Sequence, residues 1–343
     1  MATEPLISII TPVYNRASLI PATIDSIIAQ TYKDWELILV DDGSDNNTLN
    51  VLRQYEKKDT RVKVFERNRL PKGAQTCRNT GFQKAIGNFI IFLDSDDLLE
   101  DFCLEQRAKF MSENPALDFA IFPGLIFNEK KYDKNILVSD YKGDGIIPML
   151  LGLTPPCVPG NNIWKRSSLA EKNVIWDENL KAFQDVDFHL MAAYSKLSFA
   201  YSDDPPDYFW RKHDLGNTGN ELSKTDKLIS HQYFFQKHVK ILQEKNLYNQ
   251  YKNYINRLAG QLILLAFKSN NAGDAKTMIS FFKGFGKPLS RIKTSALLFL
   301  GSMYKSGGLL KALSRINVYF LYPSVFPLFK NKNFAKIKWT GNL

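Results

Sequence analysis

Residues 89–97, F-I-I-F-L-D-S-D-D, constrain the fold of this chain more than any other segment. The apolar run at 90–93 fits a strand that is covered on both faces, as in a parallel sheet. Three carboxylates follow within four positions, and since buried acids are costly, the strand must end at an edge of the sheet. In open α/β sheets, ligands bind outside the carboxyl ends of the strands.

The acidic cluster of Asp94, Asp96 and Asp97 has two interpretations on this segment alone. Clustered carboxylates repel one another unless a cation joins them. A divalent metal that carries a diphosphate would suit them, because hard cations take oxygen ligands and share them with substrate phosphates. Alternatively, Ser95, Asp96 or Asp97 caps a helix that begins near Leu98. A cap needs only one such residue, so D-S-D-D by itself does not decide.

The first 93 residues alternate between apolar strands and amphipathic helices. Strands are expected at 6–10, 35–40, 62–65 and 89–93, and helices at 18–30, 47–57 and 73–86. This alternation predicts a parallel sheet with right-handed crossovers. Pro12 is expected to mark the end of the first strand, because proline cannot donate to a ladder.

A second strand also ends in acids, since Asp41-Asp42-Gly43-Ser44 follows the apolar run at 35–40. If the acids were only helix caps, such caps would have to occur twice, both times at the carboxyl end of a strand, and this weakens the helix-cap interpretation. The first strand is not followed by G-x-G-x-x-G, and G-x-x-x-x-G-K-[ST] does not occur. The domain is therefore expected to bind a nucleotide through acids and a metal.

Three segments together resemble the N-terminal domain of family 2 glycosyltransferases: I-S-I-I-T-P-V-Y-N-R, E-L-I-L-V-D-D-G-S-D and C-R-N-T-G-F-Q-K-A-I-G-N-F-I-I-F-L-D-S-D-D. The resemblance covers about residues 6–215. It implies the GT-A fold, a Rossmann-like α/β architecture with a mixed central sheet and helices on both faces. It also implies a nucleotide-sugar donor with UDP as the carrier, a Mn²⁺ or Mg²⁺ ion, and transfer with inversion at the anomeric carbon.

The resemblance implies that two loops hold the nucleobase. Thr11, Pro12 and Tyr14 match the family's loop beneath the base. Asp42 matches the residue that accepts a hydrogen bond from uracil, and Asp41 lies beside it.

The resemblance places the diphosphate and the metal at two further motifs. Arg78 matches the R-N position near the base and diphosphate, although an exposed helix arginine is the commoner fate of such a residue. Asp94, Ser95 and Asp96 match the D-x-D motif, in which Asp94 faces the ribose and Asp96 the metal. Asp97 is expected behind them.

The catalytic base is expected in F-Q-D-V-D-F-H-L, at the start of an apolar-periodic helix. Inverting transfer needs a group within ~2.6–3.2 Å of the acceptor hydroxyl to take its proton. Asp185 matches the base of the family's E-D pair, whereas Gln184 departs from that pattern. Two alternatives stay open: Asp185 is the helix N-cap, or Asp187 is the base.

Two further segments are assigned from the resemblance. In D-Y-F-W-R-K-H, Arg211 and His213 match an R-x-H that precedes a mobile loop, and His213 would contact the metal or the diphosphate. A lone histidine is more often a surface or core residue. Asn161 and Asn162 end a Pro-rich loop and are expected to contact the acceptor sugar, with ordinary turn residues as the alternative.

The remaining elements are read from periodicity and breakers. A helix is expected at 98–115, a strand at 118–127 with a bend at Pro123-Gly124, and a hairpin or loop at 128–141. A short helix and a strand follow at 146–153 and 199–202, and helical stretches at 224–247, 251–269, 293–304 and 308–320.

The C-terminal part has a different charge balance. Residues 245–343 contain 16 Lys or Arg and one acid, a net of +15 in a chain whose total is +10. We expect a catalytic domain at 1–222 and a basic, mostly helical extension at 223–343. Basic helices with short apolar faces suit an anionic membrane surface. The alternatives are a solvated cap, or contacts with the acceptor or with a second copy in a homo-oligomer. No nucleic-acid motif occurs.

The combined prediction is a metal-assisted inverting glycosyltransferase of the bacterial surface-polysaccharide type. It would transfer a hexosyl or N-acetylhexosaminyl group to a glycan or a lipid-linked glycan. The three separated cysteines and the lack of a signal peptide predict a cytoplasmic protein, peripheral on the inner face of the membrane. A non-catalytic nucleotide-sugar or glycan-binding module is the alternative. A nucleotidyltransferase is a weaker one, because T-P-V-Y-N-R is not Gly-rich.

Overall fold

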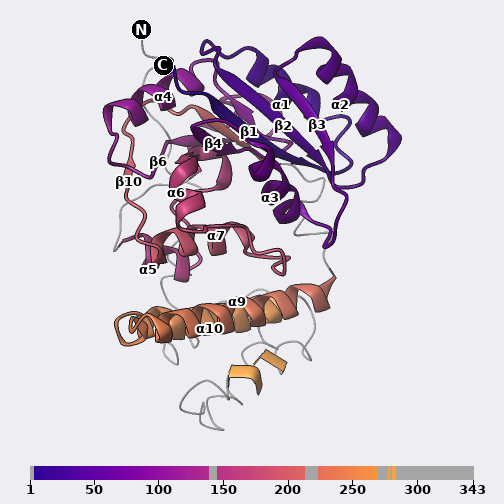
Figure 1. Ribbon diagram of the computed structural model, residues 1–343. Helices are drawn as coiled ribbons and strands as arrows, with labels where there is room; N and C mark the ends of the chain where they lie inside the picture. Colours follow the sequence, from indigo (N-terminus) through magenta and orange to yellow (C-terminus); the bar gives the residue numbers. More distant parts are fainter. Residues whose placement is uncertain (1–3, 139–144, 213–222, 269–276, 279, 283–343) are drawn as a thin grey trace.

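A seven-stranded mixed sheet forms the centre of the molecule (Figure 1). The computed structural model describes residues 4–138, 145–212, 223–268, 277–278 and 280–282. The strand order is β10-β6-β9-β4-β1-β2-β3, and β9 alone runs antiparallel to both of its neighbours. Its strands are β1 Ile7–Val13, β2 Trp35–Asp41, β3 Val62–Glu66, β4 Phe89–Phe92, β6 Phe119–Ile121, β9 Asn162–Lys165 and β10 Phe199–Tyr201. The predicted mixed sheet is confirmed.

Helices cover both faces of this sheet, because successive strand residues face opposite sides. Ile9 and Ile91 belong to one buried cluster, whereas Ile10 and Ile90 belong to the other. The first cluster is covered by α1 Ile20–Ile28, α2 Asn46–Lys58 and α4 Cys103–Glu113. The second is covered by α3 Ala74–Lys84, α6 Arg166–Glu171 and α7 Gln184–Tyr194. Strands buried on both faces explain the unbroken apolar runs of the sequence.

A second, four-stranded sheet lies beside the first and was not expected. Its order is β5-β11-β7-β8, with β5 Leu98–Leu99, β11 Tyr208–Arg211, β7 Gly124–Phe127 and β8 Ile136–Leu137. A glycine is needed at position 124, because a Cβ there would lie 2.6 Å from the Tyr208 ring. This sheet brings β11 next to the acidic end of β4.

Three predicted boundaries were wrong. The first strand does not end at Pro12 but continues to Val13. Proline is tolerated there because β4 pairs with β1 only up to Ile10, which leaves β2 as the single neighbour of β1 at Pro12. The expected helix at 98–115 begins only at Cys103, because Leu98–Leu99 forms an edge strand. The expected strand at 118–127 divides at the predicted bend into β6 and β7, which belong to different sheets.

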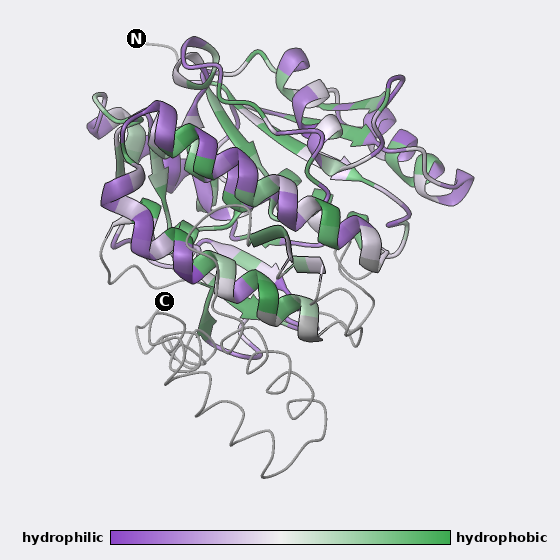
Figure 2. Cartoon of the chain, turned by 90° about the horizontal axis from the view of Figure 1, so that it is seen from below, coloured by the Kyte–Doolittle hydropathy of each residue, from purple (hydrophilic) through white to green (hydrophobic). Residues whose placement is uncertain are grey.

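Two long helices, α9 Lys224–Glu244 and α10 Tyr248–Lys268, lie side by side beneath α5 Ile146–Leu151 and α7 (Figures 1 and 2). They confirm the helices predicted at 224–247 and 251–269. Their apolar residues, including Phe234 and Leu258, join the cluster that also packs α7 against the sheet. The helices predicted at 293–304 and 308–320 lie outside the described residues. Within the described ranges, no helix is long and apolar enough to cross a membrane.

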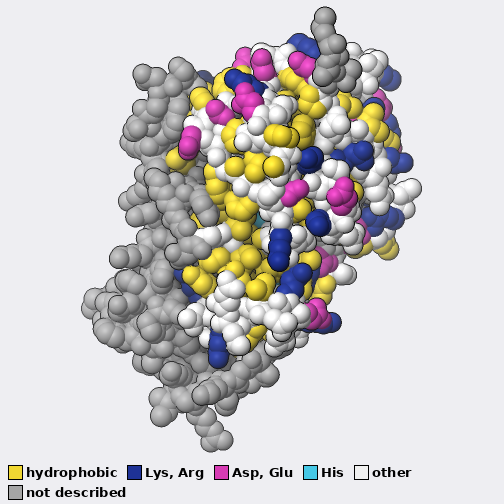
Figure 3. All heavy atoms as spheres, turned by 60° about the vertical axis from the view of Figure 1, so that its left-hand side comes forward, with side chains coloured by type: hydrophobic (Ala, Val, Ile, Leu, Met, Phe, Trp, Pro, Cys, Tyr) yellow, Lys and Arg dark blue, Asp and Glu magenta, His cyan; other side chains and the backbone are white. Residues whose placement is uncertain are grey.

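One face of the molecule, on the left of Figure 1, carries hydrophobic side chains down its middle with Lys and Arg beside them (Figure 3). The basic extension predicted to bind membrane falls mostly outside the described part of the chain. Its membrane association therefore stays a prediction.

Candidate active site

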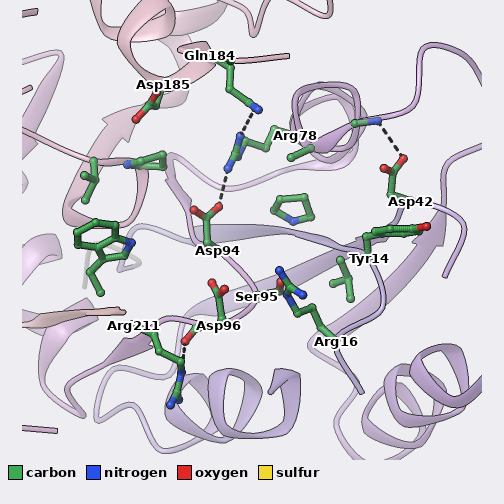
Figure 4. A pocket seen from close by; sticks show the side chains of 18 of the residues that line it. Tyr14, Arg16, Asp42, Arg78, Asp94, Ser95, Asp96, Gln184, Asp185 and Arg211 are labelled. Atoms are coloured by element: carbon green, nitrogen blue, oxygen red, sulfur yellow. Dashed lines mark hydrogen bonds and ion pairs between the residues drawn. The ribbon is translucent and has the colours of Figure 1, made fainter. Parts of the chain in front are cut away.

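A cavity of about 420 Å³ opens at the carboxyl ends of β1, β2 and β4, facing the start of α7 (Figure 4). This is the edge at which the sequence predicted ligand binding. The predicted residues that line it are Pro12, Tyr14, Asp42, Arg78, Asp94, Ser95, Asp96, Asp185 and Arg211. The structure therefore brings together residues from six separate segments of the chain.

The two acids at the end of β2, Asp41 and Asp42, have different roles. Asp41 is buried and accepts hydrogen bonds at 2.9 Å from the backbone N–H groups of Gly43 and Ser44, so it shapes the turn. Asp42 lines the cavity, and the Arg67 guanidinium donates to its Oδ1. This contact fixes the Asp42 carboxylate at the cavity wall.

The loop after β1 places two side chains in the cavity. Asn15 adopts the left-handed conformation (φ 49°), which asparagine tolerates better than most residues. Its Oδ1 accepts from the backbone N–H of Asp45 at 2.9 Å, which ties the loop to the turn after β2. Tyr14 and Arg16 then line the cavity, whereas Thr11 is fully buried within β1. The sequence did not predict Arg16 as a cavity residue, although it ends the T-P-V-Y-N-R motif.

Arg78 lies between the D-x-D motif and α7 (Figure 4). Its Nη2 donates to Asp94 Oδ1 at 2.5 Å and its Nη1 to Gln184 Oε1 at 2.9 Å. The guanidinium carbon stacks 4.3 Å from the ring centroid of Trp176, and the side chain is only 6% exposed. The alternative of an exposed helix arginine is therefore wrong. Gln184, which departs from the family's E-D pair, serves here as a hydrogen-bond acceptor for Arg78.

Asp97 supports the D-x-D loop from within the protein. It is 1% exposed and accepts hydrogen bonds from the Tyr208 hydroxyl and from the Arg211 backbone N–H. Burial, with Asp96 and Asp94 nearby, raises the pKa of Asp97 well above its usual range. The interpretation of Asp97 as a helix cap is wrong, because β5 begins directly after it.

Arg211 fixes the other end of the same loop. Its Nε donates to the Asp96 carbonyl at 2.8 Å and its Nη1 to the Asn128 carbonyl at 3.2 Å. The guanidinium also lies 4.3 Å from the centroid of the Phe127 ring. Arg211 therefore orients Asp96. His213, the second residue of the R-x-H motif, lies outside the described residues.

The D-x-D residues fit a divalent metal that is shared with a ligand. In the part of the chain that the structure describes, no group of three or more His, Cys, Asp or Glu could hold a metal by itself. Asp94 and Asp96 offer carboxylate oxygens to the cavity. Hard cations such as Mg²⁺ use one or two carboxylates and complete their shell with phosphate oxygens and water. A cation held jointly with a diphosphate therefore suits this donor set.

Asp185 lies on the opposite side of the cavity from the D-x-D loop, in the first turn of α7 (Figure 4). The N-cap of α7 is Phe183, so Asp185 is not the cap. Asp187 is fully buried and pairs with Lys237 and His238 of α9. Of the two neighbouring carboxylates, only Asp185 faces the cavity, which excludes Asp187 as a group in contact with an acceptor.

Asn161 and Asn162 lie behind the wall of the cavity and are completely buried. The Oδ1 of Asn161 accepts from the Val158 backbone N–H at 2.9 Å, and the Nδ2 of Asn162 lies 3.0 Å from His189 Nε2. The wall itself is made by Val158 and Pro159. This burial is at odds with the expected sugar contact, and in this structure both asparagines hold the wall in place.

Several cavity residues were not found from the sequence. They include Arg16, Val158, Pro159, Lys181, Phe183 and Trp210. Trp210 and Phe183 stand beside recognised motifs, so proximity in the sequence could have suggested them. Lys181 has no such signal.

Comparison with known proteins relates the N-terminal half of the chain to one family. Residues 8–171 match the model of Glycosyl transferase family 2. The chain is 43% identical over 109 residues, 32% of its length, to the UDP-Glc:alpha-D-GlcNAc-diphosphoundecaprenol beta-1,3-glucosyltransferase WfgD of Escherichia coli, of which it covers 42%.

Two solved structures share the fold. S. aureus TarS 1-349 in complex with UDP-GlcNAc superposes with a TM-score of 0.59 at 17% identity, covering 98% of this chain and 93% of that 1-349 chain. The mannosyltransferase PcManGT from Pyrobaculum calidifontis, in complex with GDP-Man and Mn²⁺, gives 0.54 at 17% identity over 96% and 89%. The predicted GT-A fold is confirmed. The chain spans less than half the length of the curated relatives that it matches.

Proposed function

We propose that this protein transfers a sugar from a nucleotide donor, with UDP as the carrier, to an acceptor hydroxyl with inversion at the anomeric carbon. The observation that carries the proposal is the convergence of Asp42, Arg78, the D-x-D pair and Asp185 on one cavity of a family 2 domain. The complexes of TarS with UDP-GlcNAc and of PcManGT with GDP-Man support a nucleotide-sugar donor.

The donor would lie along the strand ends. Tyr14 offers a ring to the base, and Asp42 accepts a hydrogen bond from its N–H edge. Arg16 and Arg78 bring positive charge to the diphosphate, since guanidinium groups pair well with phosphate oxygens. Asp94 and Asp96 would hold Mn²⁺ or Mg²⁺, which neutralises charge on the leaving diphosphate.

Asp185 would act as the base. In an inverting displacement, the acceptor oxygen attacks the anomeric carbon from the side opposite the departing diphosphate. Asp185 lies across the cavity from the D-x-D loop, so it faces the side from which that oxygen approaches. As the new bond forms, its carboxylate takes the hydroxyl proton.

The acceptor would be a glycan or a lipid-linked glycan in bacterial surface-polysaccharide synthesis. Trp210 and Phe183 line the same cavity as Asp185. Flat apolar side chains next to a few polar groups are typical of sites for small organic ligands, and they suit the faces of a sugar ring. The name of WfgD, with its diphosphoundecaprenol-linked acceptor, supports this choice.

The test combines one substitution with metal removal. Asp185→Asn should lower transfer by about 100-fold or more, while UDP still binds. Asp34→Asn, an exposed acid before β2, is the matched control. Transfer should also stop in EDTA and return with Mn²⁺. Wild-type activity in Asp185→Asn would refute the assignment of Asp185 as the base. Full transfer in EDTA would refute the requirement for a metal ion. UDP binding without turnover of any sugar donor would indicate a non-catalytic module.

A further inference from the structure

The helix that carries Asp185 is tied to the C-terminal helical pair by a buried carboxylate. Asp187, two residues after Asp185 in α7, is fully buried. Lys237 of α9 places its Nζ 2.7 and 2.9 Å from the two Asp187 oxygens. His238 Nε2 lies 3.1 Å from the same carboxylate.

Lys237 supplies the charge that this carboxylate needs. Burial lowers the pKa of His238 and so disfavours the charged form of its ring. Lys237 also lies 2.7 Å from Asp177 Oδ2, which accepts a further hydrogen bond from the Tyr233 hydroxyl at 3.0 Å. One cation of α9 thus joins the start of α7 to the segment that precedes it.

A second set of contacts from α9 holds the residues just before Asp185. Ser230 Oγ accepts from the backbone N–H groups of Lys181 and Ala182 at 3.1 and 2.9 Å. The Phe183 ring stacks on His231, with centroids 4.7 Å apart and an interplanar angle of 21°. Phe183 has φ 61°, a left-handed conformation that persists only where its surroundings impose it. These three residues, 181–183, line the cavity.

We propose that α9 is part of the active site and that Lys237 is a positioning residue for Asp185, acting through Asp187. The proposal rests on the role of Asp185 given above. Without Lys237, Asp187 would be an uncompensated buried charge, and α7 would shift to bring it towards water. Asp185 lies in the same helical turn and would move with it. A displacement of about 1 Å can reduce a rate by about 100-fold.

The test compares Lys237→Met with Lys240→Met, a lysine on the same helix whose side chain is 76% exposed. In Lys237→Met, we expect kcat for transfer to fall by about 10- to 100-fold. The donor KM and the Kd for UDP should change less than kcat does, because Asp42, Asp94 and Asp96 lie at strand ends, and Arg78 meets α7 through its hydrogen bond to Gln184. Lys237→Arg should recover part of the loss, and Lys240→Met should match the wild type.

Hydrogen–deuterium exchange supplies a readout that needs no turnover. Exchange at residues 181–190 should rise in Lys237→Met and stay unchanged in Lys240→Met. If Lys237→Met does not fold, Lys237→Gln keeps a hydrogen-bond donor near Asp187 but removes the positive charge, and it should show the same low kcat. Wild-type kcat in either folded variant, or unchanged exchange at 181–190, would overturn the proposal. Raised exchange together with an active Asp185→Asn would instead overturn only the assignment of the base.

Discussion

The ion pair of Arg107 and Asp207 is the most deeply buried charge pair in the described part of the chain. Both side chains are 0% exposed. Arg107 Nε and Nη2 donate to the two Asp207 oxygens at 2.8 and 2.6 Å. Its Nη1 donates to the carbonyls of Gly160 and Asn162 at 3.0 and 3.2 Å. This one side chain therefore connects α4, the cavity wall and the start of β11.

Replacing Arg107 by Met should destabilise the protein strongly. Removal of one partner from a buried pair costs about 3–5 kcal/mol, because the remaining charge is uncompensated. The two carbonyls that lose their donor add about 1 kcal/mol. We expect the free energy of unfolding to fall by about 4–6 kcal/mol, a large part of the ~5–15 kcal/mol typical of a folded domain.

Urea denaturation at pH 7, followed by tryptophan fluorescence, measures this loss. Asp207→Asn in the Arg107→Met background removes the stranded charge and should recover more than half of it. Lys109→Met is the control on the same helix, because its pair with Glu113 is long (4.0 Å) and exposed, and such pairs contribute less than about 1 kcal/mol. A loss in Arg107→Met as small as in Lys109→Met would refute the reasoning. A double variant as unstable as Arg107→Met would show that packing, not charge, is responsible.

Two further predictions concern His231 and Gln184. Burial lowers the pKa of His231 to about 4, so the unfolded chain binds this proton at a higher pH than the folded chain. The free energy of unfolding should therefore fall by up to about 3 kcal/mol as the pH drops from about 6.5 towards 4. Urea denaturation at pH 7, 5.5 and 4.5 measures this pH dependence, and His231→Phe should reduce it. An unchanged pH dependence in His231→Phe would contradict this cause. Gln184→Ala removes an acceptor from Arg78 and should lower kcat/KM by about tenfold, whereas Gln184→Glu should stay within about threefold of the wild type. Equal rates in Gln184→Ala and the wild type would show that this contact does not matter for transfer.

The donor half of the cavity could be predicted because its information is local in the sequence. Asp42 and Asp94 each follow an apolar strand directly, and parallel strands bring their carboxyl ends to one edge. Asp185 was expected in the site from a motif and lines the cavity, whereas the Asp187 carboxylate is buried in the contact with α9.

The parts that could not be predicted depend on contacts between distant segments. Leu98–Leu99 becomes a strand only because β11, more than 100 residues later, pairs with it. The burial of Asn161 and Asn162 follows from the packing of α7 and β6 around them, which a Pro-rich loop sequence does not reveal. Likewise, no local pattern distinguishes Lys237 from the other lysines of α9.

The two halves of the cavity are therefore built by different physical means. The donor half consists of strand ends and turns that one sheet places together, so substitutions elsewhere should disturb it little. The opposite half consists of Val158, residues 181–185 and β11, which owe their positions to buried polar contacts with α4 and α9. Because each contact is specific in charge and geometry, a single substitution in α4 or α9 can move Asp185, the proposed base, or the wall at Val158 without touching a ligand. Rate and acceptor affinity should consequently respond to remote mutations that leave UDP binding intact.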